Sequence, residues 1–193
     1  MVRGLNFRKR SAVWLVSFRI VIVSLLLGVL PILAQQGNEL VAPKPRPEDV
    51  ASPESIINAI YDTVSGPAGQ KRDWDRFRSL FASGARAITT LTQPDGTLAT
   101  RVVDVEGYIG FAGKVFETRS FFEREAARKT ETYGPITHVF STYELRQAKD
   151  DAKPSGRGID SFQLFNDGHR WWVMTMYWTG EDPKNPIPEK YLH

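Results

Sequence analysis

The spacing of apolar residues changes near residue 116, and this change limits the folds open to the chain. Before it, apolar side chains recur every three or four residues, as in helices that bury one face; after it, they alternate with polar ones, as in half-buried strands. Helices followed by consecutive strands are typical of an α+β domain, in which the helices cover one face of an antiparallel sheet.

Three helices are predicted in the first part. The first begins at "SPES", where Ser52 is a suitable N-cap, and ends near Gly66. The second begins after Asp73 and ends at Gly84, and the third begins after Asp104. Each carries an apolar stripe that can pack on a sheet.

Four strands are predicted in the second part, in the segments "FETRSFFERE", "ITHVFSTYELR", "GIDSFQLF" and "RWWVMTMYW". The segment "KTETYGP" is predicted to be the turn between the first two. Asp167-Gly168 suits a two-residue type I′ turn between the last two. "ARAITTLT" is an earlier β-prone stretch, and the proline-rich end "EDPKNPIPEKYL" is predicted to be irregular.

The first 34 residues have the features of a secretory signal: a cationic start and an apolar stretch that closes at Ala34, a suitable cleavage position. The sequence therefore predicts a signal peptide (1–34) and an exported protein, periplasmic or secreted. The alternative is an uncleaved membrane anchor, because residues 11–34 are long enough to span a bilayer. Residues 35–51 are predicted to be a proline-rich linker without a packing role, which leaves 52–193 as the domain.

Charge and composition exclude several classes of partner. Residues 1–34 hold five of the 25 Lys and Arg and none of the 22 Asp and Glu, so the rest has 20 basic residues against 22 acidic ones, a net charge of −2. Such a domain has no electrostatic basis for binding nucleic acid, and membrane contact is expected only through an uncleaved leader. Without cysteine there are no disulfides, and the three histidines lack the spacing of metal ligands, so no metal or cofactor is expected.

The order of these elements and the C-terminal run "RGIDSFQLFNDGHRWWVMTMYW…NPIPEKYL" resemble the nuclear transport factor 2-like superfamily, in particular its exported bacterial SnoaL-like members. The resemblance covers residues 52–192. It implies a cone-shaped, cystatin-like α+β fold, with about three N-terminal helices on a strongly curved antiparallel sheet and a pocket between them. Because this fold hosts isomerases, cyclases, hydrolases, dehydratases and non-catalytic domains, it implies no single reaction.

The catalytic residues of known enzymes with this fold do not carry over to this chain. Resemblance to ketosteroid isomerases implies a carboxylate base on the strand after the second helix, but "ARAITTLT" contains no acid. The Asp-Arg-Asp network of limonene epoxide hydrolases has no matching segment. SnoaL-like cyclases use an aspartate late in the sheet; Asp160 is near that position, but its parity in the predicted hairpin places it on the outer face.

The predicted hairpin gives the pocket its expected lining. With Asp167-Gly168 at the turn, one hairpin face combines large apolar side chains with two uncharged hydrogen-bonding ones, which is the usual makeup of a small-molecule site. The alternative is that these polar groups are satisfied within the core. The expected ligand is a small apolar molecule of unknown identity. The predicted ligand-binding residues are Tyr61, Trp74, Phe77, Ser161, Gln163, Trp172 and Met174.

Three residues are candidates for catalysis: Tyr61, His138 and Glu144. A strand histidine can act as a general base, and a tyrosine hydroxyl can stabilise an oxyanion. His138 and Glu144 cannot act together directly, because six residues of strand separate them by about 20 Å. Each also has a structural alternative, since Tyr61 can be a core tyrosine and His138 a structural one.

The opposite hairpin face is also apolar, which predicts a homodimer packed sheet to sheet. The leading functional hypothesis is an exported small-molecule-binding domain without a clear catalytic set. One alternative is an isomerase, cyclase or hydrolase that uses His138 or Tyr61; another is a protein-interaction or assembly module. The residues predicted at the dimer interface are Phe162, Trp171, Val173 and Tyr177.

Overall fold

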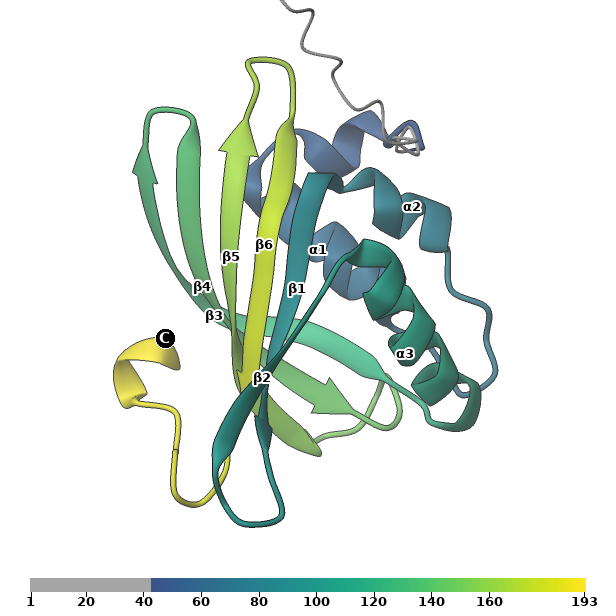
Figure 1. The fold of residues 1–193 in the computed structure, drawn as a ribbon, viewed down its shortest axis with the longest axis vertical. Coiled ribbons are helices and arrows are strands. Elements are labelled where there is room, and N and C mark those ends of the chain that lie inside the picture. The colour runs from purple at the N-terminus through teal and green to yellow at the C-terminus, as the bar shows by residue number, and fades with distance from the viewer. Residues whose placement is uncertain (1–42) are drawn as a thin grey trace, which may run out of the picture. The chain divides into compact units, whose positions relative to one another are not determined.

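The computed structural model describes residues 43–193, so the predicted signal peptide and the first part of the predicted linker lie outside the described residues. Three α-helices and six strands make up most of this part (Figure 1). No helix within residues 43–193 is long and apolar enough to cross a membrane. The elements are η1 (Pro47–Val50), α1 (Pro53–Val64), α2 (Trp74–Ser79), β1 (Phe81–Thr92), β2 (Leu98–Val103), α3 (Val105–Thr118), β3 (Phe122–Tyr133), β4 (Ile136–Arg146), β5 (Gly156–Asn166), β6 (Trp171–Gly180) and η2 (Glu189–Tyr191).

The strands form one curled sheet in the order β2-β1-β6-β5-β4-β3, and the three α-helices lie against one face of it (Figure 1). This confirms the predicted α+β architecture of three helices on a strongly curved sheet. The sheet is mixed rather than wholly antiparallel, because β1 and β6 run parallel while every other neighbouring pair runs antiparallel.

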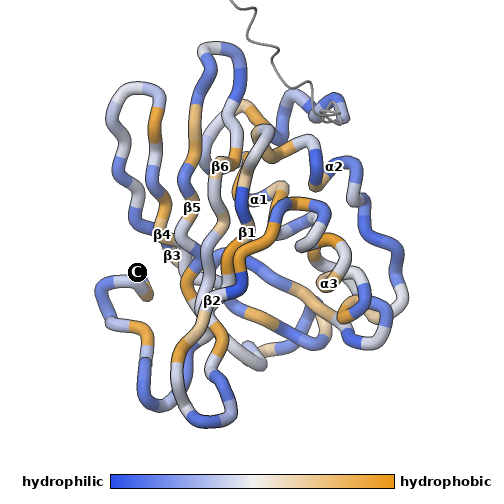
Figure 2. Tube along the Cα trace, viewed as in Figure 1, coloured by the Kyte–Doolittle hydropathy of each residue, from blue (hydrophilic) through white to orange (hydrophobic). Residues whose placement is uncertain are grey.

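The helices bury their apolar stripes against the concave face of the sheet. In α1, the side chain of Ser52 accepts a hydrogen bond from the Ser55 amide at 3.0 Å, which completes the predicted N-cap. Ile56, Ile60 and Val64 then recur every fourth residue and are buried in the core. Figure 2 shows hydrophilic residues at the tips of the β1–β2 and β5–β6 hairpins and apolar residues on α1 and α3.

Two boundaries near the start of the domain differ from those expected. Pro47–Val50 forms a 3₁₀ turn that packs on the domain, where Asp49 accepts hydrogen bonds from Arg76 at 2.8 and 2.9 Å, so this end of the predicted linker has a packing role. The second helix ends at Ser79 and not at Gly84. Gly84 lies inside β1 with φ of 77°, where the register of β1 against β6 shifts.

The predicted start of a strand at Phe116 is wrong, because β3 begins only at Phe122. α3 continues to Thr118, and the Phe116 ring is buried in this helix, stacked on Trp74 at a centroid distance of 6.1 Å. Strand β3 then runs through the predicted turn "KTETYGP" as far as Tyr133, and the chain turns at Gly134 with φ of 56°. β3 is an edge strand, whose charged and polar outer residues suit an exposed edge.

The connection between β5 and β6 is a four-residue loop and not a two-residue turn. Asn166 pairs with Trp171, which leaves residues 167–170 in the loop. The carboxylate of Asp167 accepts hydrogen bonds from the amides of His169 and Arg170, both at 2.8 Å. This side chain therefore stabilises the wider loop in place of the expected type I′ turn.

A β-bulge at Met174 explains why "RWWVMTMYW" is apolar at both parities. Leu164 pairs with Val173, whereas Gln163 pairs with Thr175, so Met174 is an extra residue in β6. Beyond the bulge, the alternation of side chains between the two faces is reversed. The side chains of β6 that pack against the core on the helix-covered face are Trp171, Val173, Met176 and Trp178.

This register corrects the predicted dimer interface. Phe162 and Val173 are completely buried in the core beneath the helices, so neither can contact a second subunit across the sheet. Trp171 is half-buried against the same core. Of the predicted interface residues, Tyr177 alone is exposed on the outer face, 38% of its surface being accessible. Homodimer formation itself stays a prediction.

Candidate active site

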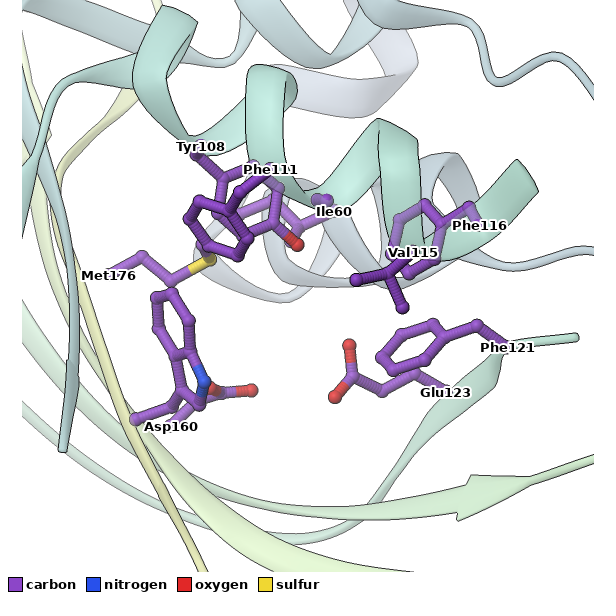
Figure 3. A pocket seen from close by; sticks show the side chains of 11 residues that line it. Ile60, Tyr108, Phe111, Val115, Phe116, Phe121, Glu123, Asp160 and Met176 are labelled. Carbon is purple, nitrogen blue, oxygen red and sulfur yellow. The ribbon is translucent and has the colours of Figure 1, made fainter. Parts of the chain in front are cut away.

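A pocket of about 160 Å³ lies between α1, α3 and the concave face of the sheet (Figure 3). Most of its lining is apolar and much of it aromatic, and the only charged residues in the lining are Glu123 and Asp160. The lining residues are Ile60, Tyr108, Phe111, Ala112, Val115, Phe116, Phe121, Glu123, Asp160, Met176 and Trp178.

The two carboxyl groups point toward one another across this pocket (Figure 3). Asp160 comes from β5 and is 5% exposed, and Glu123 comes from β3 and is half-buried. Neither forms an ion pair with any residue in the described part of the chain. A bulge at Ala126 in β3 helps to place Glu123 on the inner face, because it reverses the alternation of that strand.

The surroundings of these acids favour their protonated forms. Burial raises the pKa of Asp160 from its ordinary value of 3.8 to about 7; the hydrogen bond from Tyr61 lowers it, and the charge of Glu125 raises it again. Burial also raises the pKa of Glu123 well above its ordinary value, and the nearby charge of Asp160 adds to this. The pocket therefore holds at least one neutral carboxyl group at neutral pH.

Two tyrosine hydroxyls complete the polar part of the site. Tyr61, on the buried stripe of α1, donates a hydrogen bond from Oη to Asp160 Oδ2 at 2.9 Å, and its Oη lies 2.8 Å from Ser141 Oγ. Tyr108, on α3, lines the pocket, and its hydroxyl has no hydrogen-bond partner among residues 43–193. Burial raises the pKa of both tyrosines well above 10, so both hydroxyls stay protonated at neutral pH.

Of the predicted catalytic residues, the structure brings Tyr61 alone to the site. His138 lies on the outer face of the sheet, where its Nε2 is 2.9 Å from Ser161 Oγ. Glu144 is also on the outer face and forms ion pairs with Arg124 at 2.9 Å and Arg146 at 2.8 Å. Neither side chain lines the pocket beside Asp160.

The predicted ligand-binding residues of the hairpin also lie outside the pocket. Ser161 and Gln163 face outward on β5, because Asp160, Phe162 and Leu164, which alternate with them, are buried on the inner face. Trp172 donates from its indole to Asp167 at 2.7 Å, and Met174 is the bulged residue, 39% exposed.

The predicted helix residues support the pocket without lining it. Phe77 is fully buried and stacks on Tyr108 with a centroid distance of 5.1 Å. Trp74 is half-buried and stacks on Phe116. Both aromatic rings thus pack behind side chains that face the pocket and fix the position of α3.

Sequence reasoning missed the two acids that define the site. The correction concerns Asp160, which was predicted to face outward and in fact faces the pocket. The signal that pointed to it was its similarity in position to the late-strand aspartate of SnoaL-like cyclases. Glu123 stands in the charged segment "EREAARK", and its only local signal is the aromatic pair Phe121-Phe122 beside it.

Comparison with solved structures identifies the fold. A protein of unknown function with a cystatin-like fold from Nostoc punctiforme superposes with a TM-score of 0.51 at 12% sequence identity, covering 70% of this chain and 92% of that chain. An NTF2-like protein of unknown function from Silicibacter pomeroyi gives a TM-score of 0.47 at 12% identity, covering 68% of this chain and 94% of that chain. The fold is cystatin-like.

This match confirms, at the level of the fold alone, the cystatin-like α+β fold that the resemblance in the sequence implies. Comparison of the sequence with protein-family models and with curated proteins finds no match. The function of this domain must therefore be argued from the chemistry of its pocket.

Proposed function

We propose that the protein binds a small, mostly apolar, uncharged molecule in the pocket between α1 and α3 and transfers a proton to or from it through Asp160. The observation that carries this proposal is an aspartate with a pKa of about 7, which is buried in an apolar pocket and lacks a cationic partner. General acid–base catalysis is most effective when the pKa of the catalytic group is close to the working pH. Perturbed acids in clefts are typical of such sites.

The size and lining of the pocket define the class of ligand. A cavity of about 150 Å³ holds one benzene molecule, so a pocket of about 160 Å³ suits a ligand with a single six-membered ring. The aromatic lining and Met176 favour an apolar body. Two acids without a basic partner disfavour an anionic ligand.

These groups support proton abstraction next to a carbonyl group. Ionised Asp160 can remove a proton from the carbon adjacent to the carbonyl, while the Tyr108 hydroxyl and the protonated carboxyl of Glu123 can donate hydrogen bonds to the oxygen that becomes negative. Tyr61 positions Asp160. The proposal is therefore an isomerase-type proton transfer with Asp160 in the role that the sequence assigned to His138 or Tyr61.

The test uses cyclohexanone, a seven-atom cyclic ketone of suitable size, in D₂O. We expect the wild-type protein to accelerate loss of the α-proton signal in ¹H NMR, with a rate that rises with pH through about 7 as Asp160 ionises. Asp160→Asn should slow the protein-catalysed exchange by about 10²-fold or more, a typical contribution of a general base.

The control is Asp150→Asn, which removes an exposed loop carboxylate outside the pocket and should leave the rate unchanged. A wild-type rate equal to that of buffer, or equal rates for the wild type and Asp160→Asn, would contradict the proposal.

A further inference from the structure

A continuous chain of hydrogen bonds leads from Asp160 away from the apolar pocket. The Oη of Tyr61 lies 2.9 Å from Asp160 Oδ2 and 2.8 Å from Ser141 Oγ. The Oγ of Ser141 lies 2.7 Å from Glu125 Oε1. Three contacts of hydrogen-bond length therefore join four side chains that come from α1, β3, β4 and β5.

All three contacts are hydrogen bonds at the same time only when one of the two carboxyl groups carries a proton. The tyrosine and serine hydroxyls each carry one proton, whereas an ionised carboxylate carries none. If both acids were ionised, Tyr61 would donate to Asp160 and Ser141 would donate to Glu125. The two hydroxyl oxygens, 2.8 Å apart, would then have no proton between them. Three bonded contacts need a third proton, which sits on Asp160 or on Glu125.

The ion pair at the far end of the chain decides where this proton rests. Both the Nε and an Nη of Arg128 donate to Glu125, so this carboxylate is held in an ion pair. Asp160 has no such partner and is more deeply buried. When Asp160 carries the proton, it donates to Tyr61, Tyr61 to Ser141, and Ser141 to Glu125; when Asp160 is ionised, Tyr61 donates to Asp160 Oδ2 instead.

The two ends of the chain face different pockets. Asp160 lines the apolar pocket. Glu125 lines a second, polar pocket of about 460 Å³, which Tyr61 and Glu123 also line and Asp160 does not. The second pocket also presents the cationic side chains of Arg124, Arg146 and Lys149. A charged, wider pocket of this kind admits water, which can exchange protons with the Glu125 carboxylate.

We propose that Asp160, Tyr61, Ser141 and Glu125 form a proton relay that moves one proton between the apolar pocket and the polar pocket. In the outward step, Asp160 gives its proton to the Tyr61 oxygen, Tyr61 gives its own proton to Ser141, and Ser141 gives its own to Glu125. Each proton moves by one oxygen, and the negative charge moves from Glu125 to Asp160. The step leaves Asp160 ionised, as the base that the proposed function requires, and its reversal returns the proton.

The other ionisable groups around Asp160 do not replace this path. Burial raises the pKa values of Tyr108 and Tyr143, so neither tyrosine ionises in the neutral range. Glu123 lines both pockets, but its carboxyl group forms no hydrogen bond with Asp160, Tyr61, Ser141 or Glu125. The groups that face Asp160 from the elements packed around it are Tyr61 on α1, Tyr108 on α3, Glu123 and Glu125 on β3, and Tyr143 on β4.

The test follows the protonation of Asp160 in the full chain without any ligand. The protein is labelled with ¹³C at the aspartate carboxyl carbons, and the Asp160 signal is assigned by its loss in Asp160→Asn. Ser141→Ala removes the middle of the chain without changing any charge. Tyr61 then donates to Asp160 alone, so we expect the titration midpoint of Asp160 to fall by about one pH unit or more, a tenfold change in its proton affinity.

Two further variants separate the relay from other effects. Ser161→Ala removes a neighbouring hydroxyl on the outer face, bonded to His138, and should leave the midpoint of Asp160 within 0.3 pH units of the wild type, about the precision of such a titration. Glu125→Gln removes the outer proton acceptor and its charge and should also lower the midpoint. A midpoint in Ser141→Ala equal to that in Ser161→Ala would overturn the relay; if Ser141→Ala does not fold, an unchanged midpoint in Glu125→Gln would overturn it.

The relay rests on the proposed function, because that function supplies the molecule with which Asp160 exchanges a proton. The titration of Asp160 is carried out without a ligand and so tests the relay independently of that function. An unshifted midpoint in Ser141→Ala with normal exchange of cyclohexanone protons would refute the relay and leave the function standing. A shifted midpoint without exchange in the wild type would refute the function and leave the relay standing.

Discussion

Replacement of Asp160 by asparagine should change how the stability of the protein depends on pH. Asparagine has nearly the same shape and can still accept the hydrogen bond from Tyr61, but it cannot ionise. In the wild type, the pKa of Asp160 is about 7 in the folded state, against an ordinary value of 3.8. Between these two values the folded state keeps a proton that the unfolded chain releases, so wild-type stability falls as the pH rises through this window.

The size of the effect follows from the shift in pKa. A rise of about three units corresponds to about 4 kcal/mol of unfolding free energy lost once the pH is above 7, at about 1.4 kcal/mol for each unit. Part of this loss has already occurred at pH 5, where the unfolded aspartate is ionised. The loss that remains between pH 5 and pH 8 is about 2 to 3 kcal/mol.

The assay is urea unfolding at pH 5 and pH 8, followed by tryptophan fluorescence and analysed by linear extrapolation. We expect the stability of Asp160→Asn relative to the wild type to increase by about 2 to 3 kcal/mol from pH 5 to pH 8. Asp150→Asn, with the exposed loop carboxylate removed, should follow the wild type at both pH values. A difference between Asp160→Asn and the wild type that is the same at both pH values would refute the reasoning.

Two further predictions test the packing of β5. A Cβ atom at Gly158 would overlap the Tyr143 hydroxyl, so Gly158→Ala should cost about 1 to 3 kcal/mol, whereas Gly180→Ala, where the closest atom would be 3.9 Å away, should cost much less in the same urea assay. Phe162→Ala should cost about 3 to 5 kcal/mol because this ring is fully buried, and Phe165→Ala less than about 1 kcal/mol; equal losses would contradict the assigned strand faces.

The helix starts could be predicted because their causes are local. Ser52, Asp73 and Asp104 each accept a hydrogen bond from a backbone amide three residues later, which is the N-cap interaction that their residue types favour. The change of apolar spacing likewise predicted the α+β class, because it reflects which faces are buried. The helix and strand meet near Phe116, where neighbouring aromatic residues fit either spacing, and there the predicted boundary failed.

Which face of the β5–β6 hairpin lies inward could not be predicted, because this depends on where the helices pack against the sheet. Asp160 and Phe162 were correctly grouped with Trp171 and Val173 on one face, but that face is the inner one. The bulge at Met174 was also not predicted, and it changes the faces only of the residues of β6 that follow it. This bulge brings Met176 and Trp178 to the inner face with Trp171 and Val173 and leaves Tyr177 outside. The predicted pocket and interface residues on β5, and Asp160 itself, lie on the opposite sides from those predicted, because the hairpin face predicted to line the pocket is the outer one.

The two acids of the pocket are buried or half-buried without a cationic partner, whereas acidic residues in proteins normally lie at the surface or in ion pairs. An acid without a cation belongs in water, so a pattern-based prediction leaves Glu123 on a charged edge and Asp160 outside the core. Violations of this kind are expected at functional sites, where stability is reduced for the sake of chemistry. Here the cost is electrostatic, because burial in one small apolar pocket and the charge of neighbouring acids disfavour the ionised forms of both carboxyl groups.

The most direct test of this account is the pH titration of the Asp160 carboxyl carbon in the wild-type protein, by ¹³C NMR. A buried, unpaired acid at the apolar pocket predicts a midpoint near 7. A midpoint near 4, as for an aspartate in water, would contradict its placement in the pocket, its role as a proton carrier and the function proposed from it.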